Sequence, residues 1–224
     1  MSGPSARQIF QQRRSAVAMD GRSQLDADRF YQILQRCCPG HSAPWWSWPY
    51  APEVHLALFV HRVRGLDPGL YILVRNLDHE GQLRQALSPS FPWERPERCP
   101  ASLPLYRLDR GNLQDLAAGL CCQQEIAGDG AFMVGMICRF QAVLDSPWRY
   151  RRLFWETGMI GQVLYLEAEA AGLRGTGIGC FFDDAVHETL GIADNSFQSL
   201  YHFTLGGPVE DSRLRTLPPY PAER

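Results

Sequence analysis

The sequence contains no lysine, and all 22 basic side chains among its 224 residues are arginine. This absence excludes a catalytic lysine, and it excludes a phosphate-binding P-loop, whose motif requires one. Arginine in place of lysine, together with abundant alanine, glycine and proline, is typical of a GC-rich coding sequence. The absence of lysine therefore excludes certain kinds of site, but it does not indicate what the protein binds.

Long apolar runs are also missing, and none approaches the roughly eighteen uninterrupted positions that a membrane-spanning helix requires. The first residues, MSGPSARQIF, lack the basic segment, apolar stretch and cleavage site of a secretory signal. We therefore expect a cytoplasmic protein that does not enter a membrane. A net charge of −2 and an isoelectric point near 6.3 provide no basic field for nucleic acid.

The seven cysteines include no C-x-x-C spacing, so neither a zinc clamp nor a dithiol exchange motif is predicted. Two adjacent pairs and three single cysteines are more typical of reduced, buried residues that act as small apolar side chains. His187 and Glu188 lack the second histidine of H-E-x-x-H, because Gly191 stands in its place. No metal site is expected.

Apolar periodicity and turn residues divide the chain into alternating helices and strands. A proline-rich excursion over 88–104 and an irregular tail over 208–224 interrupt this pattern within one expected domain, 1–224. Such interleaving favours the α+β or α/β class, with helices packed on a central sheet. We expect helices over 6–15, 25–38, 112–127, 150–172 and 183–192, and strands over 53–63, 69–76, 131–140 and 199–207.

Residues 172–184, GLRGTGIGCFFDD, form the most glycine-rich segment of the chain. A dinucleotide fingerprint would need a third glycine where Cys180 stands, and it would follow a strand instead of a helix. Two interpretations remain open. The segment is either a bare backbone that accepts a flat ring edge, or a turn between helix and strand that binds nothing.

Three stretches resemble the FMN-dependent nitroreductase family, and in particular its SagB-type dehydrogenases. Residues 150–192 resemble the long helix, flavin-edge turn and short helix of that family, and 200–214, LYHFTLGGPVEDSRL, resemble its closing strand. Arg-Arg-Ser at 13–15 resembles its N-terminal phosphate motif. Residues 121–136 and 154–172 most resemble the second half of tandem SagB-like proteins. The resemblance implies an α+β, nitroreductase-like fold with a mixed, mainly antiparallel sheet and an intertwined homodimer.

The same resemblance implies a site for FMN. One guanidinium group can bind two phosphate oxygens at once. The resemblance gives this role to the N-terminal motif and to a basic residue after the last strand. Backbone amides of the glycine-rich segment would contact the ring near N5 and O4. The implied cofactor-binding residues are Arg13, Arg14, Ser15, Gly177, Ile178, Gly179, Cys180, Arg213 and Arg215.

Several residues depart from the family pattern. Val17 stands where the family frequently has a basic residue. Trp45, Trp46 and Trp48 replace small polar residues of the family pattern. Three interpretations of these tryptophans remain open: they form an aromatic wall of the flavin site, they fill that site, or they pack in the core or at a subunit interface. The Lys-Tyr pair of azoline oxidases is missing, which argues against azoline oxidation.

We interpret the sequence as that of an FMN-dependent oxidoreductase with no catalytic side chain beyond the flavin cradle. Hydride would pass through flavin N5 between a nicotinamide, NAD(P)H, or an organic substrate and a second acceptor. Small molecules or modified peptides are the expected substrates. The alternative is a flavin-free subunit of the same fold that serves as a scaffold or recognises a peptide.

Overall fold

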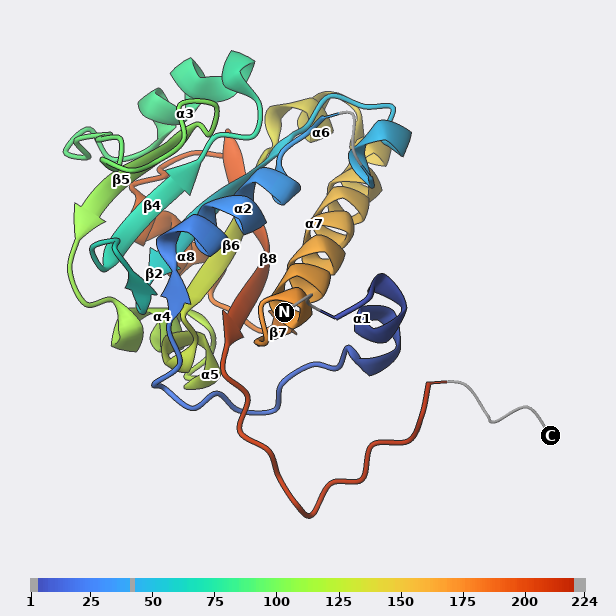
Figure 1. The fold of residues 1–224 in the computed structure, drawn as a ribbon. Coiled ribbons are helices and arrows are strands. Elements are labelled where there is room, and N and C mark those ends of the chain that lie inside the picture. The colour runs from blue at the N-terminus through green and yellow to red at the C-terminus, as the bar shows by residue number, and fades with distance from the viewer. Residues whose placement is uncertain (1–3, 41–42, 220–224) are drawn as a thin grey trace.

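The computed structural model describes residues 4–40 and 43–219, and its centre is a six-stranded sheet with the order β5-β4-β2-β6-β8-β7 (Figure 1). Every pairing within this sheet is antiparallel. The only parallel pairing between named strands in the described residues joins two short strands outside it, β1 and β3. The strands are β1 (Leu25–Asp26), β2 (Val54–Val60), β3 (Val63–Arg64), β4 (Gly69–Leu73), β5 (Leu105–Arg110), β6 (Phe132–Arg139), β7 (Arg174–Ile178) and β8 (Phe197–Gly206).

Helices cover both faces of the sheet, so the predicted α+β class is confirmed (Figure 1). One face packs against the second and seventh helices, and the other packs against the third, fourth, fifth and eighth. The α-helices are α1 (Ala6–Gln12), α2 (Ala27–Cys37), α3 (Glu80–Ala86), α4 (Gln114–Leu120), α5 (Ile126–Asp129), α6 (Gln141–Asp145), α7 (Tyr150–Ala170) and α8 (Asp183–Leu190). The 3-10 helices are η1 (Trp45–Ser47), η2 (Leu77–His79) and η3 (Pro147–Arg149).

The central strands β2 and β6 are buried on both faces, as their continuous apolar sequences require. Their side chains alternate between two apolar cores, one on each side of the sheet. In β2, for example, Leu56 and Leu58 face the core beneath α2 and α7, whereas Ala57 and Phe59 face the opposite core. The protein is therefore layered as helix, sheet and helix.

Two predicted helices differ from those observed. The first ends at Gln12, so the phosphate-like motif follows the helix instead of forming its last turn. The helix expected over 112–127 is split into α4 and α5, because Cys122 and Gln123 adopt left-handed φ angles of 56° and 61°. A helix cannot continue through residues in that conformation.

After α1, the chain forms an N-terminal arm, residues 13–20, beside the edge strand β7. Ser15 forms a parallel bridge with Gly175, and the Ala16 amide donates to the Gly175 carbonyl at 3.1 Å. Further on, the Asp20 amide donates to the Gly207 carbonyl at 2.9 Å. Residues near the start of the chain and residues near its end are thereby placed at one edge of the sheet.

The proline-rich stretch 88–104 forms no helix or named strand, and the predicted tail has neither over the residues described here. Residues 220–224 of that tail lie outside the described residues. No helix in the described part of the chain combines the length and apolar character needed to cross a membrane.

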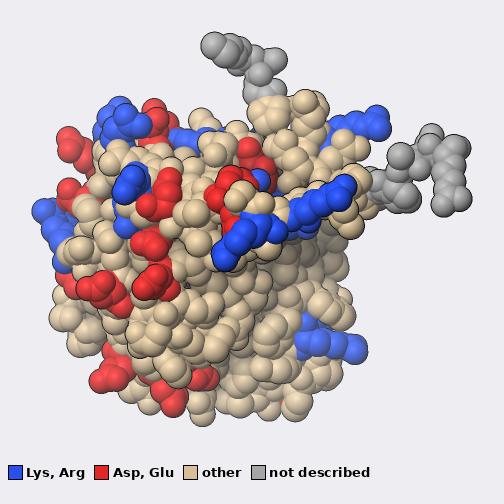
Figure 2. Space-filling view, turned by 90° about the horizontal axis from the view of Figure 1, so that it is seen from below, with Lys and Arg blue, Asp and Glu red and all other residues tan. Residues whose placement is uncertain are grey.

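Acidic and basic side chains are intermixed on the face shown in Figure 2, beside a broad area that carries neither charge. This face has no continuous basic track of the kind that follows a nucleic-acid backbone.

Candidate functional site

The glycine-rich segment is an edge strand followed by a loop, which corrects the prediction of a turn. Residues 174–178 form β7 and pair in register with β8, so that Gly177 lies opposite Phe203 and Ile178 opposite His202. Gly172, with φ of 72°, ends the preceding helix in the left-handed conformation that glycine favours. Only Gly179 and Cys180 of the predicted ring-edge residues lie beyond the strand.

Aromatic rings explain why two glycines occupy this strand. A Cβ atom on Gly175 would lie 2.5 Å from Cε1 of Phe203, and a Cβ atom on Gly177 would overlap the hydroxyl of Tyr201 and lie 2.8 Å from its Cζ. Tyr165, on α7, packs edge-to-face on Phe203 with their ring centroids 4.7 Å apart. The backbone is bare on this face because these rings need the space.

Replacing Gly177 with alanine should lower the free energy of unfolding by about 1–3 kcal/mol, the usual cost of overpacking a filled site. The matched control is Gly179→Ala, because a Cβ atom there meets nothing within 4 Å. The control should change the free energy of unfolding by no more than about 0.5 kcal/mol. Urea denaturation of both variants measures the difference, and Tyr201→Phe should partly rescue Gly177→Ala by removing the hydroxyl. Equal stability of the two glycine variants would contradict this explanation.

A polar cluster joins the N-terminal arm, α7 and β7 at this edge. The Tyr165 hydroxyl lies 2.7 Å from Ser15 Oγ and accepts a hydrogen bond from the Gly177 amide at 3.0 Å. The Arg13 guanidinium lies over the Tyr165 ring, with Cζ 4.8 Å from the ring centroid. Among the described residues, Arg13 has no carboxylate partner within salt-bridge distance. The cluster therefore contains a cation that is available to an anionic ligand.

The other predicted arginines do not join this cluster. The Arg14 guanidinium donates to the carbonyls of Gln11, Arg13 and Leu217, at 3.1, 2.7 and 2.9 Å, so it anchors backbone segments. Arg213 pairs with Asp211 at 2.7 Å, its side chain is 87% exposed, and this pairing raises its pKa. Arg215 is exposed. In the structure Arg14 thus bonds to backbone carbonyls, and Arg213 pairs with a neighbouring carboxylate.

An open groove of about 240 Å³ runs along α7 beside the cluster. Tyr165 of the cluster lines this groove, together with Tyr201 and with small residues of α7 such as Gly158 and Gly161. Gly179 is exposed, and its backbone N–H donates to no acceptor in the described structure. The groove is lined by Phe154, Thr157, Gly158, Gly161, Gln162, Tyr165 and Tyr201.

The tryptophan segment does not form a single wall. Trp45 is buried, and its indole N–H donates to the Arg36 carbonyl at 2.7 Å, whereas Trp46 is 70% exposed. Trp48 packs edge-on against Tyr50, with ring centroids 5.2 Å apart. Trp45 is thus a core residue, in line with one of the interpretations left open by the sequence.

Val17, on the same arm as Ser15, is 73% exposed. It therefore projects an apolar side chain into solvent where the family pattern frequently has a basic one.

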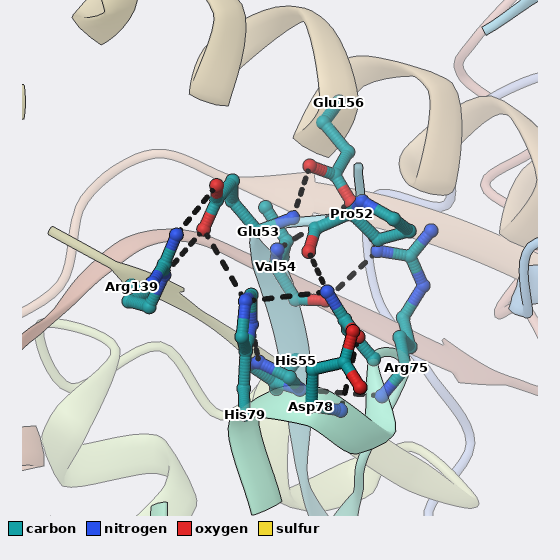
Figure 3. A network of polar contacts seen from close by, with 10 residues as sticks. Pro52, Glu53, Val54, His55, Arg75, Asp78, His79, Arg139 and Glu156 are labelled. Atoms are coloured by element: carbon teal, nitrogen blue, oxygen red, sulfur yellow. Dashed lines mark hydrogen bonds and ion pairs between the residues drawn. The ribbon is translucent and has the colours of Figure 1, made fainter. Parts of the chain in front are cut away.

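Sequence reasoning missed a buried polar network on the other side of α7 (Figure 3). Arg75, which follows β4, forms an ion pair with Glu156 of α7, and both side chains are almost completely buried. Glu156 also accepts a hydrogen bond from the Glu53 amide at 3.0 Å, and Glu53 pairs with Arg139 at 2.7 Å. Burial lowers the pKa of His55, which contacts the ring of His79.

This network has no open coordination site for a metal, since no group of three metal-ligating side chains occurs among residues 4–40 and 43–219. It joins α7 to β2 and to the end of β4, so its role is to fix the helix that carries Tyr165.

The described architecture, an antiparallel sheet between two helical layers with a glycine-rich edge strand, defines a nitroreductase-like α+β protein. The model of the nitroreductase family matches residues 71–207 of the sequence. The chain belongs to the nitroreductase family. No curated protein matches it in sequence.

Solved structures share this fold. A protein from Anabaena variabilis described as a nitroreductase is 26% identical with a TM-score of 0.65, and the match covers 88% of this chain but 37% of that one. A chain of the E. coli microcin synthetase McbBCD complex, with truncated pro-MccB17 bound, is 18% identical with a TM-score of 0.62. This match covers 94% of this chain and 75% of that one. The NADPH:FMN oxidoreductase from Vibrio harveyi is 14% identical with a TM-score of 0.52, and the match covers 94% of this chain and 71% of that one.

Proposed function

We propose that this protein is an FMN-dependent oxidoreductase of the nitroreductase family. The observation that carries the proposal is the meeting of Arg13, Ser15 and the β7 backbone at one edge of the sheet, beside an open groove. Family membership supports the general activity, and the Vibrio harveyi relative is an FMN oxidoreductase by name.

The residues present fit the cofactor at two points. Arg13 and Ser15 would hold the phosphate, because the guanidinium lacks a carboxylate partner among the described residues and the hydroxyl is exposed. The unused amide of Gly179 would face the ring edge, where no side chain intervenes. Tyr165 would orient Ser15 through their hydrogen bond. When bound, the flavin supplies the group that accepts a hydride and passes it on.

The finer assignments belong to the same proposal. A SagB-type dehydrogenase, with NAD(P)H or an organic substrate as hydride donor, is supported by the fold shared with the microcin synthetase chain. A homodimer is supported by exposed aromatic side chains at the start of α7, since Trp155 is 49% and Phe154 42% exposed. The groove borders this surface, so a second subunit would help to enclose it.

Replacing Arg13 with alanine should weaken FMN affinity by about tenfold to a hundredfold, because a charge-assisted hydrogen bond contributes about 1.5–3 kcal/mol. The measurement is a titration of the apoprotein with FMN, followed by quenching of flavin fluorescence. Arg110→Ala is the matched control, because Arg110 is exposed on β5 at the opposite edge of the sheet. The control variant should bind FMN as the unsubstituted protein does.

Unchanged FMN affinity in Arg13→Ala would remove the phosphate assignment. If Arg213→Ala weakens FMN binding and Arg13→Ala does not, the phosphate is held by the C-terminal tail instead of the N-terminal arm.

A flavin-free subunit is the second candidate, and one observation favours it. The Tyr165 hydroxyl already accepts the Gly177 amide hydrogen bond, and Tyr201 and Phe203 fill the space against the glycines. A folded protein that binds no FMN at saturating concentration would support this candidate, which acts as a scaffold or recognises a peptide.

A further inference from the structure

Two cysteines distant in sequence meet where α4 ends and the loop after β7 begins. Cys122 lies in the left-handed turn that separates α4 from α5, and Cys180 lies in the loop between β7 and α8. Cys180 is exposed and Cys122 is half-buried, which corrects the expectation of buried cysteines for this pair.

Two hydrogen bonds join the two segments. The Phe182 amide donates to the Leu120 carbonyl at 2.8 Å. The Gln124 side-chain amide donates to both the Cys121 carbonyl at 2.7 Å and the Cys180 carbonyl at 3.1 Å. The side chain of Cys180 is the main cause of a raised pKa at the Cys122 thiol. Leu120 and Phe182 are each two residues from one of the cysteines, so their hydrogen bond places Cys122 and Cys180 on adjacent segments.

The neighbouring cysteine is unsuited to redox chemistry. Cys121 is buried, and burial raises the pKa of its thiol to about 12. Its Sγ lies 3.3 Å from Nδ1 of His202, but burial lowers the pKa of His202 to about 4, so that no thiolate–imidazolium pair forms at neutral pH. The accessible thiols at this place are those of Cys122 and Cys180.

We propose that Cys122 and Cys180 form a reversible disulfide with a small-molecule disulfide, such as oxidised glutathione, as the oxidant. The Cys180 thiolate attacks one sulfur of the oxidant, breaking its S–S bond and releasing one glutathione thiolate. The Cys122 thiolate then attacks Cys180 Sγ and releases the second. Both protein thiols are oxidised, the oxidant is reduced to two thiols, and those thiols take up the two protons.

The disulfide fixes the loop that follows β7 to the end of α4. Gly179 and Cys180 are in this loop, so oxidation restrains the backbone next to the polar cluster. The proposal concerns thiol chemistry alone and is independent of flavin binding, so its test needs no flavin.

The test exposes the reduced full-length chain to glutathione buffers of increasing oxidised fraction, traps free thiols with N-ethylmaleimide, and maps tryptic peptides without reduction. Because the chain has no lysine, trypsin cuts only after arginine and leaves Cys122 in peptide 111–139 and Cys180 in peptide 175–213. These peptides should be cross-linked through the two cysteines, and dithiothreitol should release them. Oxidation should also raise the thermal midpoint of unfolding by several degrees.

Cys180→Ser and Cys122→Ser should abolish the cross-link and the thermal shift, and circular dichroism verifies that each variant is folded. Cys99→Ser is the matched control, because this half-buried thiol lies in the proline-rich stretch and contacts the local carbonyls of Pro100 and Leu103. It should leave both effects unchanged. A disulfide between Cys121 and Cys122, a glutathione adduct that persists on Cys180, or a cross-link that survives Cys180→Ser would overturn the proposal.

Discussion

Replacing Glu156 with glutamine should lower the free energy of unfolding by about 3–5 kcal/mol, the cost of leaving a buried charge without its partner. The Arg75 side chain is 0% exposed and that of Glu156 is 2% exposed. Glutamine has nearly the same shape but no charge, so the substitution isolates electrostatics from packing. Since domains of this kind are stable by about 5–15 kcal/mol, the loss is a large share of the total.

The position of Arg75 explains why no other group compensates. Its guanidinium donates to the carbonyls of Cys37 at 2.7 Å and Val54 at 2.8 Å, but one of its terminal nitrogens has no partner among the described residues. Its face lies 4.6 Å from the centroid of Trp45. Carbonyl dipoles and an aromatic ring stabilise a cation less than a carboxylate does, so Arg75 cannot rely on them alone.

Urea denaturation of the purified variant measures the change. The matched control is Asp26→Asn, which removes the same charge from an exposed pair, Arg64–Asp26, whose side chains are 67% and 66% exposed. The control should lose no more than about 1 kcal/mol. If the free energy of unfolding falls equally little in both variants, the buried pair contributes no more to stability than a surface pair, and the interpretation of the network is wrong.

The elements of the fold could be predicted from the sequence because their periodicity is strong. The continuous apolar runs of β2 and β6 and the long amphipathic pattern of α7 lie within the expected ranges. Glu156 could also have been noticed, since it lies four residues before Ile160 on the same buried stripe of α7. What the sequence does not show is the partner, because Arg75 is 81 residues away and comes next to it only through the sheet.

The candidate site was harder to predict for a different reason. Glycines at 175 and 177 show that space is needed at the backbone, but they do not show whether a ligand or a side chain fills it. In the structure, Phe203 and Tyr201 fill it. Likewise, the family resemblance implies a phosphate role for Arg213, but the sequence does not show that Arg213 pairs with Asp211, two residues away.

Lowering the pH from 7 to 5 should destabilise the protein by about 2 kcal/mol for each of two buried histidines. Burial lowers the pKa of His61 and of His202 from 6.5 to about 4. Below pH 6.5, the unfolded chain therefore binds protons that the folded chain does not. Their contribution is fully present above pH 6.5 and is lost progressively as the pH falls toward 4, so stability rises with pH in this window.

The structural cause is clearest at His61. Its Nε2 lies 3.2 Å from the Ala127 carbonyl, whereas Nδ1 is buried without a partner among the described residues, so a second proton would be enclosed with no acceptor. His61→Gln keeps an N–H donor and removes the titration, so it should reduce the loss between pH 7 and pH 5 by about 2 kcal/mol. Asp26→Asn is the matched control, because it changes an exposed side chain and leaves both histidines in place. Chemical denaturation at each pH measures both slopes, and a His61→Gln variant as acid-sensitive as the unsubstituted protein would show that His61 is protonated equally in the folded and unfolded states.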